Sequence, residues 1–250
     1  MTLQTLLLTL LLSTSLINTS YADIEDGYYA SNHRNYQNTI KEWRSSADQG
    51  DSEAQYNLGW MYDKGDGVLK DYKQAVKWYQ KAADQGYADA QYSLALMYRK
   101  GEGVLKNYKQ AVKWYQKAAD QGDADAQFNL GVMYRYGKGV LQDDKQAVKW
   151  YQKAADQGYA DAQYNLGWMY DNGKGVLKDY KQAVKWYQKA TDQGYADAQY
   201  NLGAMYIDGT GVLKDMTKAK YWIKKADEGD NAETSKLAKE IWDRFELWKY

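Results

Sequence analysis

The segment Asp71–Lys106 reads DYKQAVKWYQKAADQGYADAQYSLALMYRKGEGVLK, and it decides the fold. It recurs with few changes at residues 107–142, 143–178 and 179–214, and a looser copy occupies residues 35–70. The period is 36 residues in every copy, without slippage. A fixed period of this size is typical of a solenoid, in which each unit stacks only on its neighbours.

Each copy predicts two antiparallel helices joined by glycine-containing turns. Apolar and small residues recur with the spacing of one helical face in each half of the copy: Ala75, Val76, Trp78, Tyr79, Ala82 and Ala83, then Ala90, Leu94, Ala95, Met97 and Tyr98. Gly86 suits a left-handed helix end, and Gly101 and Gly103 suit the turn after the second helix. We therefore expect an all-α solenoid of helices of about 12 to 14 residues.

The chain divides into a leader, two caps and five repeats. The predicted segments are a signal peptide at 1–22, N-terminal capping helices at 23–50, repeats at 51–86, 87–122, 123–158, 159–194 and 195–230, and a C-terminal capping helix at 231–250. The C-terminal stretch KLAKEIWDRFELWKY is predicted as one longer amphipathic helix with an apolar side at Leu237, Ile241, Trp242, Phe245 and Trp248. Divergent terminal repeats are expected, because they must cover an otherwise open core.

The first 22 residues predict export. They carry no charged side chain, contain a leucine-rich run at Leu6–Leu12, and end in Ser20-Tyr21-Ala22 before Asp23. A short apolar region followed by small residues is typical of a cleaved secretory signal, so we expect a periplasmic or secreted bacterial protein. An uncleaved anchor is the alternative, since no Lys or Arg lies near Met1.

Composition narrows the classes of partner and chemistry. Lys and Arg together number 33, as do Asp and Glu, and this balance argues against nucleic acid or an acidic membrane surface as the default partner. Cysteine is absent and His33 is the one histidine, so thiol catalysis and cysteine zinc sites are excluded. We expect no cofactor, no metal and no stable membrane insertion after signal cleavage.

The repeated aspartates have a structural explanation. One series is Asp84, Asp120, Asp156 and Asp192, and the other is Asp89, Asp125, Asp161 and Asp197. The second series falls in the first turn of a helix, where a carboxylate interacts favourably with the helix dipole and the free amides. A hydrolase would need one unique pair of carboxylates, which this regular arrangement does not provide.

The copies can be compared with one another to separate packing from function. Residues needed for stacking should be the same in each copy, as are the leucines Leu58, Leu94, Leu130, Leu166 and Leu202. Other columns of the second predicted helix vary, and together with an aromatic column they form one stripe with the properties of a binding surface. The predicted partner-binding residues are Tyr56, Trp60, Tyr92, Leu96, Arg99, Lys100, Phe128, Val132, Arg135, Tyr136, Tyr164 and Trp168. Neutral drift among recent duplications is the competing interpretation of this stripe.

The run A-Q-Y-N-L-G-x-M-Y-x-x-G-x-G-V closely resembles the Sel-1-like repeat family, a tetratricopeptide-type α/α solenoid. The resemblance implies a right-handed superhelix whose concave face carries the helices beginning at Ala54, Ala90, Ala126, Ala162 and Ala198. It also implies a ligand role for the column Asn57, Ser93, Asn129, Asn165 and Asn201, although hydrogen bonds between helices would explain these residues equally well. Cysteine-rich exported relatives are described as penicillin-binding or weak β-lactamases, but this chain lacks their cysteines.

These observations favour an exported scaffold without enzymatic activity that binds a peptide or protein segment in its concave groove. The central part of the stripe, with Arg99, Lys100 and Arg135, is basic and favours an acidic or C-terminal segment. Trp60 and Trp168 would flank it as aromatic anchors. A cell-wall or β-lactam hydrolase and a self-assembling solenoid joined through its C-terminal aromatic residues are the alternatives, and a monomer is favoured over an oligomer.

Overall fold

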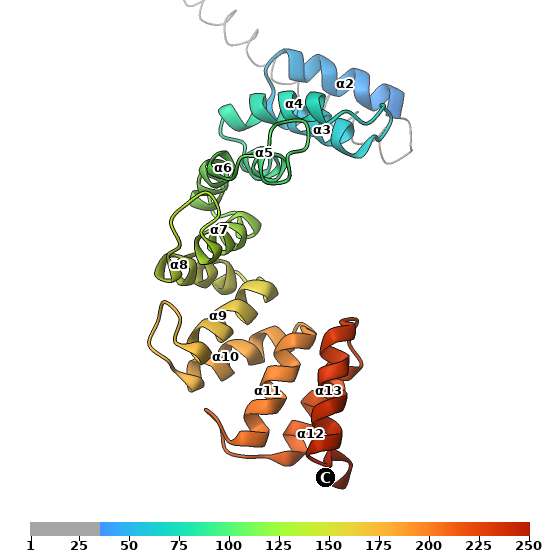
Figure 1. Cartoon of the computed structure of the whole chain (residues 1–250). Coiled ribbons are helices and arrows are strands. Elements are labelled where there is room, and N and C mark those ends of the chain that lie inside the picture. The colour runs from blue at the N-terminus through green and yellow to red at the C-terminus, as the bar shows by residue number, and fades with distance from the viewer. Residues whose placement is uncertain (1–35) are drawn as a thin grey trace, which may run out of the picture. The chain divides into compact units, whose positions relative to one another are not determined.

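The computed structural model describes the backbone of residues 36–250 and the side chains from Ile40 onward. All regular structure in this range is helical (Figure 1). The helices are α2 Tyr36–Asp48, α3 Ser52–Lys64, α4 Tyr72–Asp84, α5 Ala88–Lys100, α6 Tyr108–Asp120, α7 Ala124–Tyr136, α8 Asp144–Asp156, α9 Ala160–Asn172, α10 Tyr180–Thr191, α11 Ala196–Asp208, α12 Met216–Asp227 and α13 Ala232–Arg244, followed by the 3-10 helix η1 Leu247–Lys249. The predicted signal peptide, the first part of the predicted N-terminal capping helices and His33 lie outside the described residues.

The helices form the predicted succession of hairpins, which is the architecture of an α solenoid. We call the odd-numbered helices α3 to α13 the A helices and the even-numbered helices α2 to α12 the B helices. The chain forms two compact units, Met1–Gln121 and Gly122–Tyr250, which we call the N-terminal and C-terminal units and describe separately.

Local sequence sets the ends of the helices. Asp179 caps helix α10, because its Oδ1 accepts hydrogen bonds from the backbone amides of Lys181 at 2.9 Å and Gln182 at 3.0 Å. Helix α9 ends at Gly173 with φ of 64°, and the B-helix glycine Gly158 has φ of 93°. The prediction of left-handed glycines at these turns is confirmed, as are the helix lengths of 12 or 13 residues.

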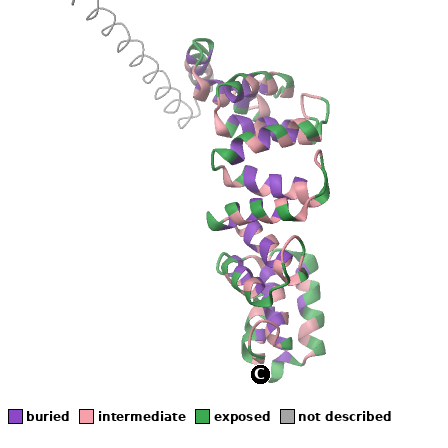
Figure 2. Ribbon diagram, turned by 90° about the vertical axis from the view of Figure 1, so that its left-hand side faces the viewer, coloured by how far each residue is buried: buried purple, intermediate pink, exposed green. Residues whose placement is uncertain are grey.

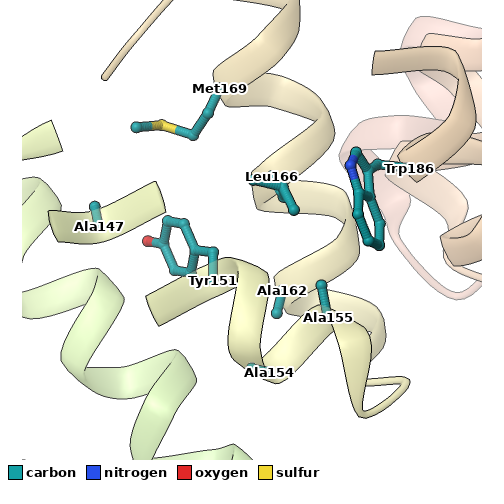
Figure 3. Packing of buried hydrophobic residues seen from close by; sticks show 8 residues of the cluster. All are labelled: Ala147, Tyr151, Ala154, Ala155, Ala162, Leu166, Met169 and Trp186. Carbon is teal, nitrogen blue, oxygen red and sulfur yellow. The ribbon is translucent and has the colours of Figure 1, made fainter. Parts of the chain in front are cut away.

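The core lies between the A and B helices, as the buried residues drawn in purple show (Figure 2). Figure 3 shows one cluster of the C-terminal unit, formed by Ala147, Tyr151, Ala154, Ala155, Ala162, Leu166, Met169 and Trp186. The ring of Tyr151 from α8 and the side chain of Leu166 from α9 are both less than 1% exposed. Small alanines beside large rings let neighbouring helices approach closely, so each repeat is stabilised by its neighbours.

A ladder of glutamine side chains joins successive repeats. Gln193 Nε2 donates to the backbone oxygen of Gly158 at 2.8 Å and to Gln163 Oε1 at 2.9 Å, while Gln163 Nε2 donates to Ala155 O at 3.1 Å. The same pair of donor bonds recurs from Gln85, Gln121 and Gln157. This ladder gives a donor to the buried side-chain oxygens of Gln55, Gln91, Gln127 and Gln163 and fixes the spacing between their repeats.

Substituting one glutamine of the ladder should measure how much its hydrogen bonds between repeats stabilise the protein. We expect Gln193→Ala to lower the free energy of unfolding by about 1 to 3 kcal/mol, because the amide of Gln163 loses a partner and the oxygen of Gly158 loses a donor. Urea denaturation followed by circular dichroism would measure the change. Gln152→Ala is the matched control, since Gln152 Nε2 donates to the exposed Asp156 within one helix, and equal losses for the two variants would contradict a role between repeats.

The loops that contain Gly103, Gly175 and Gly211 touch the preceding repeat through backbone. Gly175, in the loop between α9 and α10, has φ of +71°, and a Cβ placed on it would lie 2.3 Å from the backbone oxygen of Asp144 at the start of α8. Gly103 and Gly211 approach Tyr72 and Tyr180 in the same way. Glycine is required here both for its conformation and for the close approach.

The C-terminus corrects one prediction. The stretch expected as one long helix ends at Arg244, because Glu246 adopts φ of +49° and turns the chain into η1. This turn buries Leu247 completely against Ile223, Ala226 and Ala238. Trp248, which was predicted for the apolar face, is instead 52% exposed.

Candidate partner-binding surface

Arg135, a cation of the predicted stripe, is held by contacts with two neighbouring side chains of the next repeat. It lies in the last turn of α7, and its Nη1 donates to Asn165 Oδ1 of α9 at 2.6 Å. Its guanidinium carbon lies 4.0 Å from the ring centroid of Trp168 and 5.2 Å from that of Tyr136. A guanidinium held by an amide and stacked on an indole is already positioned for a carboxylate partner.

Neighbouring side chains leave this cation accessible. Tyr136 is 57% exposed, and Arg135 and Trp168 are half-buried. Val132 is half-buried and packs against the core of α8 and α9. We call the surface formed by Val132, Arg135, Tyr136 and Trp168 the A-face.

Asn165 explains the asparagine column in structural terms. Its Nδ2 donates to the backbone oxygen of Asp161 in the same helix at 2.8 Å, and Asn129 makes the same bond to Asp125. Its carbonyl is the one that accepts from Arg135. The residue therefore positions the arginine from the neighbouring repeat, a role that comparison of the copies did not identify.

The aromatic column of the stripe is packed between rings. Phe128 lies 5.8 Å from Tyr151 and 5.2 Å from Tyr159, and Tyr164 lies 6.0 Å from Tyr187. In the N-terminal unit Tyr56 contacts Tyr79 and Tyr87, and Tyr92 contacts Tyr115. These rings, which were predicted as partner-binding residues, are half-buried, because the next hairpin covers one side of each of them.

The N-terminal unit presents the remaining predicted residues on α3 and α5. Trp60 is 38% exposed, Leu96 is half-buried, and Lys100 forms an exposed ion pair with Glu102 at 3.5 Å. Arg99 lies near the buried Tyr115: burial raises the pKa of the Tyr115 hydroxyl, and Arg99 opposes this shift. Sequence comparison missed Arg44, whose Nη2 donates to the Tyr62 hydroxyl at 2.7 Å, because α2 departs from the repeat pattern.

An acidic group lies in the same helix as Trp168. Burial raises the pKa of the Asp171 carboxyl, and Lys178 and the Tyr187 hydroxyl oppose this shift. The charged carboxylate is therefore disfavoured in the folded protein relative to the unfolded chain. Because the folded pKa is the higher one, stability is lost as the pH rises from the unfolded value of 3.8 through the folded value.

Asp171→Asn should remove this pH dependence. We expect the variant to be more stable than the wild type at pH 7, by less than about 1 kcal/mol because the site is partly solvated, and equally stable at low pH, where Asp171 is protonated. Thermal unfolding at several pH values would measure the difference. An equal difference at every pH would show that charge is not its cause.

A cavity continues the stripe toward the C-terminus. It has a volume of about 360 Å³ between α11 and α13, with Tyr200, Ala204, Ile207, Leu237, Arg244 and Phe245 among its lining residues. Ile207, which belongs to a variable column of the predicted surface, is only 2% exposed because α13 packs over this end. The column therefore changes from a polar surface on α7 and α9 to an apolar wall on α11.

The repeated aspartates make structural hydrogen bonds, within one helix in the first series and to the next repeat in the second. Asp156 accepts a hydrogen bond from Gln152 in its own helix at 2.9 Å, and Asp161 accepts from the Tyr195 hydroxyl of the next repeat at 3.0 Å. The structural explanation of both aspartate series is consistent with these contacts. Within residues 36–250 no group of three or more His, Asp or Glu side chains is arranged to hold a metal ion.

The Sel1 repeat family matches the chain at residues 52–87, 88–123, 124–159, 160–195 and 196–229. A Sel1 repeat protein from Oxalobacter formigenes has a similar crystal structure, with 36% identity, a TM-score of 0.81 and coverage of 90% of each chain. The structure of c5321, a protective antigen of uropathogenic Escherichia coli strains displaying an SLR fold, has 34% identity and a TM-score of 0.86. The match covers 95% of this chain and 52% of c5321, so the chain spans about half the length of that protein.

A search of curated proteins gives no match. None of the helices between Tyr36 and Tyr250 is long and apolar enough to span a bilayer. The match of the Sel1 repeat over residues 52–229, together with the helical hairpins and the two similar crystal structures, shows that the chain belongs to the Sel1 repeat family.

Proposed function

We propose that this chain is a scaffold that binds an acidic segment of a partner protein on the A-face, with Arg135 as the central contact. Repeats of the Sel1 and tetratricopeptide types are in general scaffolds for protein–protein interaction. The proposal adds the surface, the charge of the ligand and the residue that recognises it.

The single observation that carries the proposal is the arrangement of Arg135 between two repeats. Asn165 holds one of its nitrogens at 2.6 Å, and the Trp168 ring supports its flat face at 4.0 Å. The buried Tyr151 hydroxyl also lies near this guanidinium, and the N–H groups that neither neighbour occupies can bind the oxygens of a carboxylate, which gives affinity and orientation together. The exposed ring of Tyr136 beside it offers apolar contact to the same ligand.

The N-terminal unit supports a second contact region of the same kind. Trp60 and Lys100 are exposed, and Arg99 occupies the position that corresponds to Arg135 one repeat earlier. The leucine-rich sequence at 1–22 supports export of the scaffold as part of the proposal.

Selection from a library of random peptides on the full chain would test the proposal. We expect the selected peptides to be enriched in Asp and Glu, and Arg135→Ala to weaken their binding by about tenfold or more, which is the usual cost of losing a charge-assisted hydrogen bond. Fluorescence anisotropy with labelled peptides would give the dissociation constants.

Two further variants sharpen the test. Arg135→Lys keeps the charge but cannot donate from a planar fork, so it should restore only part of the affinity. Lys149→Ala removes a cation on the exposed side of α8 and should leave binding unchanged. Peptides without acidic enrichment that bind Arg135→Ala as tightly as wild type would refute the proposal.

A further inference from the structure

One leucine in each repeat lies almost entirely in solvent. It follows the loop valine of the sequence G-x-G-V-L, between the A and B helices. These leucines are Leu69 at 92%, Leu105, Leu141 and Leu177 at 91%, and Leu213 at 90% exposure. Five identical leucines that bury nothing do not stabilise the stack, so their presence requires another explanation.

The loop itself presents the leucine outward. Val176 packs partly buried against the core cluster of α8 and α9, so the loop is anchored immediately before Leu177. Val68 and Val212 anchor the loops before Leu69 and Leu213 in the same way. The loops that join A to B helices also lie on one edge of a stack of parallel hairpins, so within each unit the leucines share that edge.

A lysine and an aromatic ring accompany the leucine in several repeats. Lys178 Nζ lies 4.7 Å from the ring centroid of Tyr180, a ring that is 37% exposed. The same pairing joins Lys70 to Tyr72 at 4.6 Å and Lys106 to Tyr108 at 5.1 Å. An apolar tip, a tyrosine and a lysine are the residue types that proteins place where hydrocarbon meets lipid headgroups.

Charge is separated between the two edges of the C-terminal unit. The leucine edge carries exposed lysines at Lys138, Lys145, Lys174, Lys178, Lys181, Lys214 and Lys218. Among its aspartates, Asp143, Asp179 and Asp215 accept hydrogen bonds from backbone amides at the starts of B helices, where the helix dipole offsets their charge. Asp144, Asp171 and Asp208 lie on the same edge. The other edge, where B helices lead to A helices, carries Asp156, Asp161, Asp192, Asp197, Asp227, Glu228 and Asp230, with fewer lysines, Lys153, Lys189, Lys224 and Lys225, in the last turns of its B helices. Although the total charge is balanced, lysines outnumber aspartates on the leucine edge and carboxylates outnumber lysines on the other edge. We call the second the acidic edge.

We propose that the leucine edge docks on an anionic lipid bilayer, with the leucines inserted among the headgroups and the lysines on the lipid phosphates. A bilayer is a uniform surface, and one identical contact repeated along an edge fits such a surface, whereas the side chains of a folded protein partner differ from place to place. The acidic edge is repelled by the same bilayer, so the charge separation also sets the orientation. This peripheral contact requires no membrane-spanning helix.

A dye placed at one leucine would test the docking. The chain has no cysteine, so Leu177→Cys can be labelled specifically in the full chain with the environment-sensitive fluorophore NBD. We expect blue-shifted emission when vesicles of phosphatidylcholine containing phosphatidylglycerol are added, and little shift with phosphatidylcholine alone. High salt should weaken the response, because the lysine contribution is electrostatic. The dye reports its own surroundings, so attachment of the chain through residues 1–22 alone would leave it unshifted.

Matched variants decide the outcome. The fluorophore NBD attached at Asp192→Cys, on the acidic edge, should show no shift of its emission. Leu141→Ser with Leu213→Ser in the Leu177→Cys chain should raise the lipid concentration for half-maximal shift by about tenfold or more, because two inserted apolar side chains are lost. These exposed substitutions should leave the circular dichroism spectrum unchanged. Equal shifts at both edges, no shift on anionic vesicles, or a shift that follows protein concentration without lipid would each overturn the proposal, and the last result would indicate a second copy of the chain as the partner.

Discussion

Gly175→Ala should lower the free energy of unfolding by about 2 to 5 kcal/mol, which is a large fraction of the stability of a domain of this size. Two costs add. The positive φ of 71° is unfavourable for alanine, and the new Cβ would lie 2.3 Å from the backbone oxygen of Asp144. Neither backbone can move without disturbing the start of α8, so the clash cannot be relieved by a side-chain rotation.

Gly158→Ala separates the two costs. Gly158 also has a positive φ, of 93°, but a Cβ there meets nothing within 4 Å. This control should lose only about 1 to 2 kcal/mol, which is the conformational cost alone. Urea denaturation of both variants would measure the difference, and equal losses would show that the contact between the loop of one repeat and the B helix of the preceding repeat has no energetic weight.

Tyr115→Ala should destabilise the N-terminal unit by about 3 to 5 kcal/mol, since it removes a large buried ring. The Tyr115 side chain is less than 1% exposed, and its ring centroid lies 5.9 Å from that of Tyr92. The helices around it are held by the loops at both ends and cannot collapse into the space. Thermal unfolding would show the loss as a lower midpoint.

Tyr115→Phe is the control, because it keeps the aromatic ring and removes only the hydroxyl. The Tyr115 hydroxyl is buried, and among the described residues it has no hydrogen-bond partner. Removing it should therefore cost less than about 1 kcal/mol or stabilise the protein slightly, because no bond is lost and no polar group remains to be desolvated. A loss as large as that of Tyr115→Ala would mean that the hydroxyl, and not the ring, stabilises this position.

The sequence predicted the helical hairpins because local and repeated signals agree. The alanine and leucine stripes, the aspartate or asparagine before the B helices α4 to α12 and the glycines after most helices all indicate the same boundaries, and each was copied several times. The C-terminal helix was extended too far because an apolar stripe continues past Arg244. Only the burial of Leu247 makes the turn at Glu246 favourable, and that contact depends on tertiary structure.

The candidate surface was predicted in outline and missed in its details. Variation between copies identified Arg135 and Trp168, but it could not show that Asn165 binds Arg135, since asparagine occupies that position in most copies and so resembled a packing residue. The leucine edge was missed for a related reason. Identity between copies was interpreted as a requirement for stacking, whereas Leu177 and its equivalents are identical and exposed.

The glutamine ladder has a consequence for how the chain can change in length. Gln157 and Gln193 each reach back 35 residues to a glycine oxygen and 30 residues to a glutamine amide. Deleting or duplicating 36 residues within the repeats therefore places the same donor opposite the same acceptors. The contact between the newly adjacent repeats needs no further substitution. Unequal recombination between nearly identical gene segments would give viable longer and shorter proteins, so selection can adjust the number of repeats as readily as a single side chain.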